Sequence, residues 1–215
     1  MTPMSAMRRG ALTLGIFALI TAGSVALTRA LTAERISEHR EAYQHRQLQA
    51  VLPQAMADIP TAELLNGTFA LPAPAALGHR GPATGWRISR EEGQAIVLPV
   101  ITRQGYSGEI DLLVGMQLEP DGQPRISGVR VTYHQETPGL GDRIEAQRSD
   151  WITRFNGLRL DDLPPDGWAV KKDGGQFDGF TGATITPRAV IQAVYGALQY
   201  AERLPPPAPE QEPAS

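Results

Sequence analysis

The sequence predicts an α+β protein, in which one N-terminal transmembrane helix precedes a single domain with a mainly antiparallel sheet flanked by helices. Three observations predict this class. Residues 10–28 carry no charge, residues 94–134 alternate strand-like runs with turns, and residues 190–201 place apolar side chains at helical spacing. The length of 215 residues leaves room for one domain of ordinary size plus appendages.

Residues 10–28 predict the membrane anchor, because a helix of this length crosses about 30 Å of hydrocarbon. Arg8 and Arg9 precede the span and are expected to stay cytoplasmic, which places the rest of the chain across the membrane. The alternative is a cleaved signal peptide, for which Ser24-Val25-Ala26 is a passable cleavage signal. With the anchor retained, the predicted segments are a cytoplasmic N-terminus (1–9), a transmembrane helix (10–28), a helical juxtamembrane stalk (29–53), a domain beyond the membrane (54–204) and a disordered proline-rich tail (205–215).

The composition excludes several classes of function. The net charge of −3 gives no basic stripe for nucleic acid, so we expect no nucleic-acid partner. The chain has no cysteine, which excludes disulfides, thiolate zinc sites, cysteine-ligated iron–sulfur clusters and a cysteine nucleophile. Its four histidines have no spacing that suggests a metal cluster. Redox chemistry in this chain would therefore require an organic cofactor.

The stalk is predicted to be helical from Thr32 to Leu52, where Pro53 ends it. Its sparse apolar stripe is expected to rest on the domain, and it consists of Ile36, Tyr43, Leu48, Val51 and Leu52. Prolines and glycines are frequent from Pro53 to Arg90, so loops and short strands are expected there.

Three strands are predicted in succession, at residues 94–102, 110–118 and 126–134, with turns at 105–108 and 120–122 between them. Pro99 marks an edge or a bulge in the first of these strands. Such closely spaced strands predict an antiparallel meander.

Two helices are predicted after the sheet. A short one covers residues 150–155, capped by Ser149 or Asp150, with Trp151 and Phe155 as core partners. A brief strand is expected at 168–170. The last helix is predicted from Pro187 to about Arg203, with Thr186 as its N-cap and Pro187 as its first residue.

Thr184 precedes this helix by two positions and so belongs to its N-terminus, where free N–H groups and the helix dipole favour an anion such as phosphate. Gly182 and Ala183 keep the approach uncrowded. A bare phosphate site normally has more glycines or a lysine, so the threonine hydroxyl itself is the group of interest.

The stretch Asp178-x-x-Thr181-Gly182-Ala183-Thr184 resembles the flavinylation motif of the FMN-binding domain family. In that family a flavin transferase links FMN to the last Thr or Ser through a phosphoester bond, so the resemblance implies that Thr184 is the covalent attachment site. It also implies contacts to the cofactor from Thr181, Gly182 and Ala183, and an orienting role for Asp178 on the hydroxyl or the transferase metal. The family more often has Ser at the position of Thr181, and both residues offer a hydroxyl. The alternative interpretation is a capped helix start after an ordinary turn.

Residues 134–141 resemble a second signature of the same family, a loop that meets the flavin. Glu136 and Thr137 are expected to supply polar contacts to the cofactor, with Leu140 and Gly141 beside it. The alternative is a rigid turn of coincidental composition. Lys171 is expected to neutralise a phosphate near Thr184, although a solvated lysine pair with its neighbour is equally compatible.

Both signatures, the anchor, the chain length and the proline-rich end together resemble the G subunits of Rnf (Rsx) electron-transport complexes. The resemblance implies a single-pass protein of the bacterial inner membrane, with a periplasmic FMN-binding domain and with the other complex subunits, a flavin transferase and the lipid bilayer as partners. Such complexes couple electron transfer between ferredoxin and NAD to ion translocation, and this subunit is not expected to be catalytic alone. Two alternatives remain open: the similar C subunit of the sodium-translocating NADH:quinone reductase, and a membrane-anchored binding or scaffold module without a redox role.

Overall fold

The computed structural model describes residues 3–56, 58–90 and 93–205. It divides into two compact units, one up to Gln44 and one from His45 onward, which are described separately. Residues 206–215, which make up most of the predicted disordered tail, lie outside the described residues.

The first unit is helical and belongs to α1 (Pro3–Gln49). Within the described residues, Gly10–Ala33 is the one helical stretch long and apolar enough to cross a membrane. The hydroxyl of Thr21 donates to the carbonyl of Phe17 (2.7 Å) and that of Thr28 to the carbonyl of Ser24 (2.8 Å). These bonds satisfy polar side chains within the helix, as a lipid environment requires. The side chain of Ile36, predicted on the stalk's stripe, lies outside the described residues.

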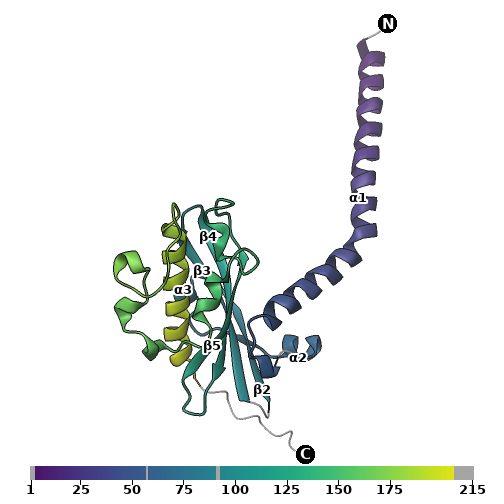
Figure 1. Ribbon diagram of the computed structural model, residues 1–215. Coiled ribbons are helices and arrows are strands. Elements are labelled where there is room, and N and C mark those ends of the chain that lie inside the picture. The colour runs from purple at the N-terminus through teal and green to yellow at the C-terminus, as the bar shows by residue number, and fades with distance from the viewer. Residues whose placement is uncertain (1–2, 57, 91–92, 206–215) are drawn as a thin grey trace, which may run out of the picture. The chain divides into compact units, whose positions relative to one another are not determined.

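The second unit contains a five-stranded antiparallel sheet whose strands follow one another in chain order, which confirms the predicted fold class (Figure 1). The strands are β1 (Thr68–Ala70), β2 (Thr84–Arg90), β3 (Gly93–Gly105), β4 (Gly108–Leu118) and β5 (Pro124–Tyr133). Pro99 lies beyond Val97, the last residue of β3 that pairs with β2. Its carbonyl accepts a hydrogen bond from Nε2 of His79 (2.9 Å). Pro99 still pairs with Leu113 of β4, but on the β2 side of the strand no partner needs its missing N–H.

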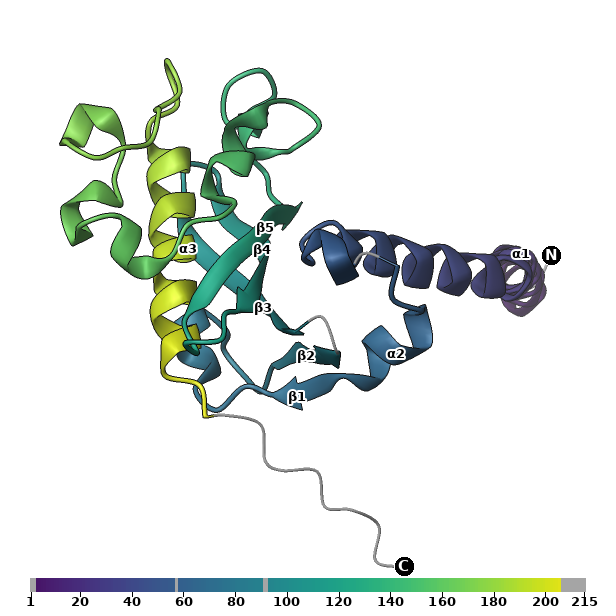
Figure 2. The same cartoon turned by 60° about the horizontal axis from the view of Figure 1, so that its bottom comes forward.

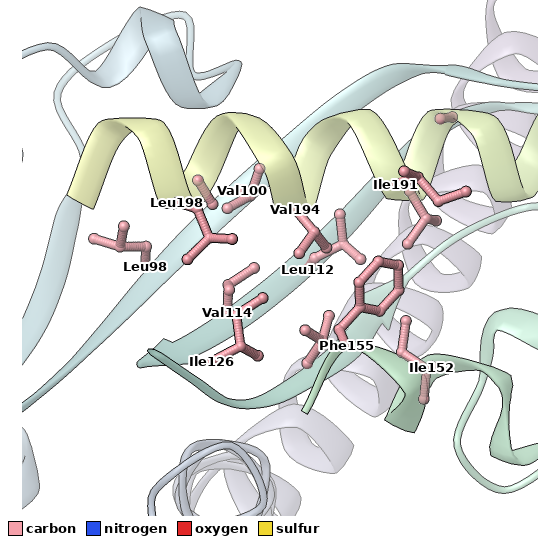
Figure 3. Close-up of a cluster of buried hydrophobic side chains, with 14 of the residues drawn as sticks. Leu98, Val100, Leu112, Val114, Ile126, Ile152, Phe155, Ile191, Val194 and Leu198 are labelled. Carbon is pink, nitrogen blue, oxygen red and sulfur yellow. The ribbon is translucent and has the colours of Figure 1, made fainter. Parts of the chain in front are cut away.

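One face of the sheet packs against α3 (Ile185–Glu202), which runs along β3 to β5 (Figure 2). The alternation along each strand sends every second side chain to this face. Figure 3 shows the resulting core, to which α3 and a 3-10 helix η4 (Asp150–Phe155) also contribute. Its labelled members are Leu98, Val100, Leu112, Val114, Ile126, Ile152, Phe155, Ile191, Val194 and Leu198.

A second core is formed by the strand residues that alternate with those of the first core. The end of α1, the 3-10 turn η1 (Gln54–Met56) and α2 (Thr61–Asn66) also contribute to it. Its buried members are Leu48, Val51, Leu52, Met56, Ile59, Leu64, Ile88, Ala95, Val97 and Leu113. The helix α2 was not predicted, because a six-residue helix without a capping side chain carries little sequence signal.

The backbone of Val51 lies against a pair of glycines, Gly115 on β4 and Gly128 on β5, which face each other across the strands. The hydroxyl of Ser127 donates to the Val51 carbonyl (2.5 Å). α1 ends at Gln49, three residues before the predicted end, and Val51 and Leu52 make turn-type bonds to Leu48 and Gln49 instead. The chain thereby leaves the helix early enough to lay its backbone on the two glycines.

The connection from β5 to α3 is built from short 3-10 turns. These are η3 (Asp142–Ile144), η4, η5 (Leu160–Asp162), η6 (Pro165–Gly167) and η7 (Lys171–Asp173), and a further one, η2 (Pro74–Leu77), precedes β2. Ser149 caps η4 by accepting a hydrogen bond from the amide of Trp151 (3.0 Å). The predicted strand at 168–170 is reduced to a single bridge between Val170 and Phe177.

Candidate functional site

Thr184 is the N-cap of α3, so the prediction that Thr186 caps the helix and Pro187 begins it was wrong. The backbone carbonyl of Thr184 accepts the amide of Arg188 (3.5 Å), which makes this the first bond of the helix. The Thr184 backbone is helical, with φ −74° and ψ −22°, whereas an N-cap residue usually lies in the β region.

The hydroxyl of Thr184 makes no capping hydrogen bond. The backbone conformation of Thr184 and the proline at position 187 explain why. The helical backbone of the residue turns its side chain away from the usual capping geometry, and Pro187 occupies the third helical position, where the amide that a capping hydroxyl often binds is missing. The half-buried hydroxyl at this helix start is therefore available for other chemistry.

The turn before Thr184 is held at its base and open at its tip. The indole Nε1 of Trp151 donates to the carbonyl of Asp178 (2.7 Å), and the buried ring of Phe180 packs edge-on against the same indole at 5.0 Å. The amide of Ala183 closes the turn on the carbonyl of Phe180 (3.1 Å). Thr181 and Gly182 are exposed, and Gly182 has φ +83°, a conformation that favours glycine.

The second predicted loop lies beside this turn. The amides of Leu140 and Gly141 both donate to the carbonyl of Thr137, at 3.1 and 3.0 Å, and fold residues 137–141 into a tight turn. A Cβ atom on Gly182 would lie 3.6 Å from Cδ2 of Leu140, so the tips of the two segments are in contact. Leu140 remains 43% exposed and Thr137 is also exposed, so both can contact a ligand.

Glu136 belongs to the same loop but faces the interior, where it is 4% exposed. Its Oε1 accepts the backbone amide of Ser107 (3.0 Å), and its Oε2 accepts the hydroxyl of Thr186 (2.5 Å). A Cβ on Gly105 or Gly141 would come within 2.7 or 2.8 Å of this carboxylate, so both glycines make room for it. The carboxylate thus links the β3–β4 turn, the loop and the first turn of α3.

Lys171 forms an ion pair with Asp178, with Nζ 2.6 Å from Oδ1, and both side chains are more than half exposed. The hydrogen bond from Lys171, and then its charge, hold the pKa of Asp178 below the ordinary value for a carboxyl group. The predicted phosphate-neutralising lysine is therefore paired with the first residue of the predicted motif.

The arrangement fits a phosphate-bearing ligand held on the surface. The available hydroxyl lies at the positive end of an 18-residue helix. The amides of Ile185 and Thr186, which precede Pro187, belong to the first turn and have no acceptor within the helix. Leu140 and Ile185, 43% and 46% exposed, offer apolar surface for a flat ring next to it. A separate groove of about 660 Å³ lies at the opposite end of α3, between Ala201, Leu204 and the β3–β4 strands, and so is remote from Thr184. No cluster of three metal-ligating side chains occurs among the residues that the structure describes.

Sequence reasoning missed the roles of Thr186, Ser107 and the Trp151 indole. Thr186 carried a misleading signal, because a threonine followed by proline is typical of an N-cap. Ser107 contributes only its backbone amide, which every residue type except proline can supply. Trp151 was predicted as core, which its 7% exposure agrees with, but its bond to Asp178 had no local signature.

Comparison with known proteins identifies the family of the chain. The FMN-binding domain family matches residues 105–199, and the RnfG N-terminal region family matches residues 1–51. The G subunit of the ion-translocating oxidoreductase complex of Pseudomonas aeruginosa is 46% identical over 196 residues, covering 90% of this chain and 88% of that protein. The corresponding G subunits of Vibrio cholerae (42% over 199 residues, 92% and 91% covered) and Pectobacterium atrosepticum (44% over 205 residues, 94% of each) are similarly close. The predicted resemblance is thus confirmed, and the chain belongs to the RnfG family, the G subunits of ion-translocating oxidoreductase complexes, with an FMN-binding domain.

Proposed function

We propose that this subunit is a membrane-anchored electron relay of an Rnf complex and that Thr184 carries FMN covalently through a phosphoester bond. The observation that carries the proposal is the uncapped hydroxyl of Thr184 at the start of α3. It belongs to an FMN-binding domain, and it is the last residue of the motif that resembles the flavinylation sequence.

Attachment requires a flavin transferase and FAD. Oγ1 of Thr184 forms a new bond to the phosphorus of the FMN half, while the bond from that phosphorus to the bridging oxygen breaks. AMP leaves with the bridging oxygen, and the hydroxyl proton passes to a base of the transferase or to water. No electron is transferred in this step, and the products are the phosphodiester and AMP.

The residues around Thr184 are suited to holding the product. The amides of Ile185 and Thr186 and the dipole of α3 stabilise the phosphate negative charge. Gly182 leaves space above the turn, while Leu140 and Ile185 supply exposed apolar surface. Thr137, Thr181 and Ala183 line the approach, while Gly141 is buried and makes room for the Glu136 side chain. Lys171 with Asp178 forms a charged pair on the segment that leads to Thr184.

When bound, FMN supplies the one- and two-electron redox chemistry that the amino-acid side chains of this chain lack. A covalent link keeps the cofactor in place at a surface site, where a non-covalent ligand would dissociate into the surrounding compartment. Arg8 and Arg9 orient the anchor with the N-terminus in the cytoplasm and the domain in the periplasm of a bacterial inner membrane. There the subunit exchanges electrons with other subunits of a complex that couples electron transfer between ferredoxin and NAD to ion translocation.

The test is flavin fluorescence of the denatured chain in a gel, together with its intact mass, after expression in cells with an active flavin transferase. Wild type and Thr184→Ser are expected to give a fluorescent band with the mass of one attached FMN, and Thr184→Ala a dark band at the mass of the chain. Thr153→Ala, which removes an exposed hydroxyl from η4, is the matched control and should stay fluorescent. A wild-type chain of 23.2 kDa without flavin would instead support a binding or scaffold module.

A further inference from the structure

Two alternative starts compete for α3, and the structure adopts the one with weaker local preference. A helix that begins at Pro187 would have Thr186 as N-cap and proline at the first position, both of which are favoured. The observed helix begins at Ile185 and leaves its N-cap, Thr184, without a side-chain hydrogen bond. Something outside the segment therefore has to favour the earlier start.

The hydroxyl of Thr186 is withdrawn from capping by Glu136. To cap a helix that starts at Pro187, this hydroxyl would have to accept the amide of Arg188 or Ala189. Instead Thr186 is 0% exposed, its hydroxyl donates to Oε2 of Glu136 (2.5 Å), and the amide of Arg188 binds the carbonyl of Thr184. The hydroxyl keeps its lone pairs, so the inward direction of the side chain is what keeps it from capping. With Thr186 turned inward, its backbone is placed inside the helix.

Glu136 is fixed by contacts that do not involve α3. Its Oε1 binds the amide of Ser107 (3.0 Å), and its own amide donates to Nδ1 of His134 (3.0 Å). Because Nδ1 accepts, Nε2 of His134 carries the hydrogen that it donates to Oε1 of Glu145 (2.9 Å). The carboxylate is thus positioned by the sheet and its loop, and Thr186 has to come to it.

We infer that Glu136 is a positioning residue that selects Ile185 as the start of α3 and so places the Thr184 hydroxyl at the helix N-terminus. Its carboxylate is buried and each of its oxygens accepts a hydrogen bond from the protein, so it acts through the helix and not by direct contact with a ligand. The consequence for flavin attachment rests on the proposed function of Thr184, whereas the choice of helix start does not.

Two substitutions remove the same hydrogen bond from opposite ends, and the inference predicts opposite results for them. Glu136→Met keeps the side-chain length in this buried position but frees Thr186 to cap, so the helix start should move to Pro187. Thr186→Val also breaks the bond, but valine is a poor N-cap, so the start should stay at Ile185. If the bond between Thr186 and Glu136 only stabilised the contact of the loop with α3, both variants would destabilise the start of α3 equally.

Hydrogen–deuterium exchange of the full chain in detergent, resolved to single amides, reads the helix start without any flavin. Arg188 and Ala189 have helical acceptors, the carbonyls of Thr184 and Ile185, only when the helix begins at Ile185. In Glu136→Met the Thr186 hydroxyl caps one of these two amides, and the other should exchange roughly tenfold faster or more, with Val190 onward unchanged. Thr186→Val should match the wild type at both amides.

Three further variants make the comparison specific. In Glu136→Gln the amide oxygen can accept from Ser107 while the amide NH₂ donates to the Thr186 hydroxyl, so both contacts are kept and the wild-type pattern should remain. Glu145→Gln changes a carboxylate of the same network that does not reach α3, and should also leave the two amides unchanged. Val194→Ala destabilises the core of α3 away from its start and should not speed Arg188 and Ala189 selectively. Glu136→Ala serves as a second acceptor-free variant if the methionine chain does not fold.

Flavin attachment is measured on the same proteins with purified transferase and FAD. Glu136→Met should lose roughly tenfold in attachment rate, a larger loss than in Thr186→Val, which keeps the backbone amide at this position and the start at Ile185. Equal exchange in Glu136→Met and Thr186→Val overturns the inference, as does a shifted start with undiminished attachment. If wild-type chain takes up no flavin while the exchange pattern appears as described, the proposed function fails and the helix-start assignment stands.

Discussion

The two facing glycines under Val51 allow a quantitative prediction for residues 48–52, the segment that follows the long N-terminal helix. In Gly115→Ala the new Cβ would lie 2.0 Å from the Val51 carbonyl oxygen and 2.7 Å from its carbonyl carbon, both well inside the 3.4 Å at which ordinary contact begins. The obstacle is backbone, which cannot rotate away. Val51 must therefore move off β4 or the strand must distort.

The free-energy change can be bounded from both sides. Overpacking a well-packed site costs typically 1–3 kcal/mol. Complete release of the segment would expose Leu48, Val51 and Leu52, at roughly 1.5–3 kcal/mol each, and break the Ser127 bond, at about 1 kcal/mol. Partial retreat is thus cheaper than release, and we expect a loss of about 3 kcal/mol and a melting temperature lower by about 6–12 °C.

Thermal unfolding of the full chain in detergent, followed by circular dichroism, tests this prediction. Gly128→Ala has a milder contact, 2.9 Å from Cα of Val51, and should lose only about 1 kcal/mol. Gly196→Ala is the control of opposite sign: it lies within α3 with nothing within 4 Å of the new Cβ, and should stabilise by about 0.5–1 kcal/mol. If Gly115→Ala melts within about 1 °C of the wild type, residues 48–52 do not pack on the sheet as described.

Two further predictions concern the turn that precedes Thr184. The pKa of Asp178 is lowered by Lys171, so this carboxyl should titrate below 3.8 in carbon-13 spectra of the full chain and return toward that value in Lys171→Met. Because the pKa of Asp178 is lower in the folded chain, any stability from this pair is present above the unfolded pKa and is lost as the pH falls through the folded value. An unchanged titration midpoint of Asp178 in Lys171→Met would argue against the pair. Gly182→Ala, at φ +83°, should lower the free energy of unfolding in urea by about 1–2 kcal/mol. The control Gly81→Ala, with open space and no positive φ, should lower it by less than about 0.5 kcal/mol. Equal effects of the two substitutions would show that a side chain at position 182 does not strain the turn.

The sequence predicted the elements whose signal is local. Alternating Val129 and Val131 and the turns at 105–108 and 120–122 define a meander without further information, and the structure has it. The apolar positions of the last helix likewise predict its buried stripe, including Val190, Val194 and Leu198. In these elements, each residue's preference agrees with its burial in the fold.

The start of the last helix could not be predicted, because it depends on a residue 50 positions upstream. Thr186 and Pro187 carry a strong local signal for a cap, and only the buried carboxylate of Glu136 reverses it. The same limit applies to α1, whose end is set by the space that Gly115 and Gly128 leave on the sheet. Glycine in a strand indicates a close approach, but the sequence does not say which backbone approaches.

The Thr184 hydroxyl is available because the features that would let it cap the helix are absent. Pro187 removes one amide, the helical backbone of Thr184 itself disfavours capping, and Glu136 keeps Thr186 from taking over the cap and shifting the start. A hydroxyl at a helix start is normally consumed by the helix. Here the helix is satisfied without it, and its first turn still presents free amides and a positive dipole.

The sheet connects this site to the point where the chain enters the domain. α3 packs on one face of β3 to β5, while Leu48, Val51 and Leu52 pack in the separate core that includes Val97 and Leu113. Alternate residues of the same strands therefore support both elements, and neither can shift without disturbing side chains of the strands they share. A cofactor on Thr184 would accordingly move together with residues 45–52, which belong to the same compact unit.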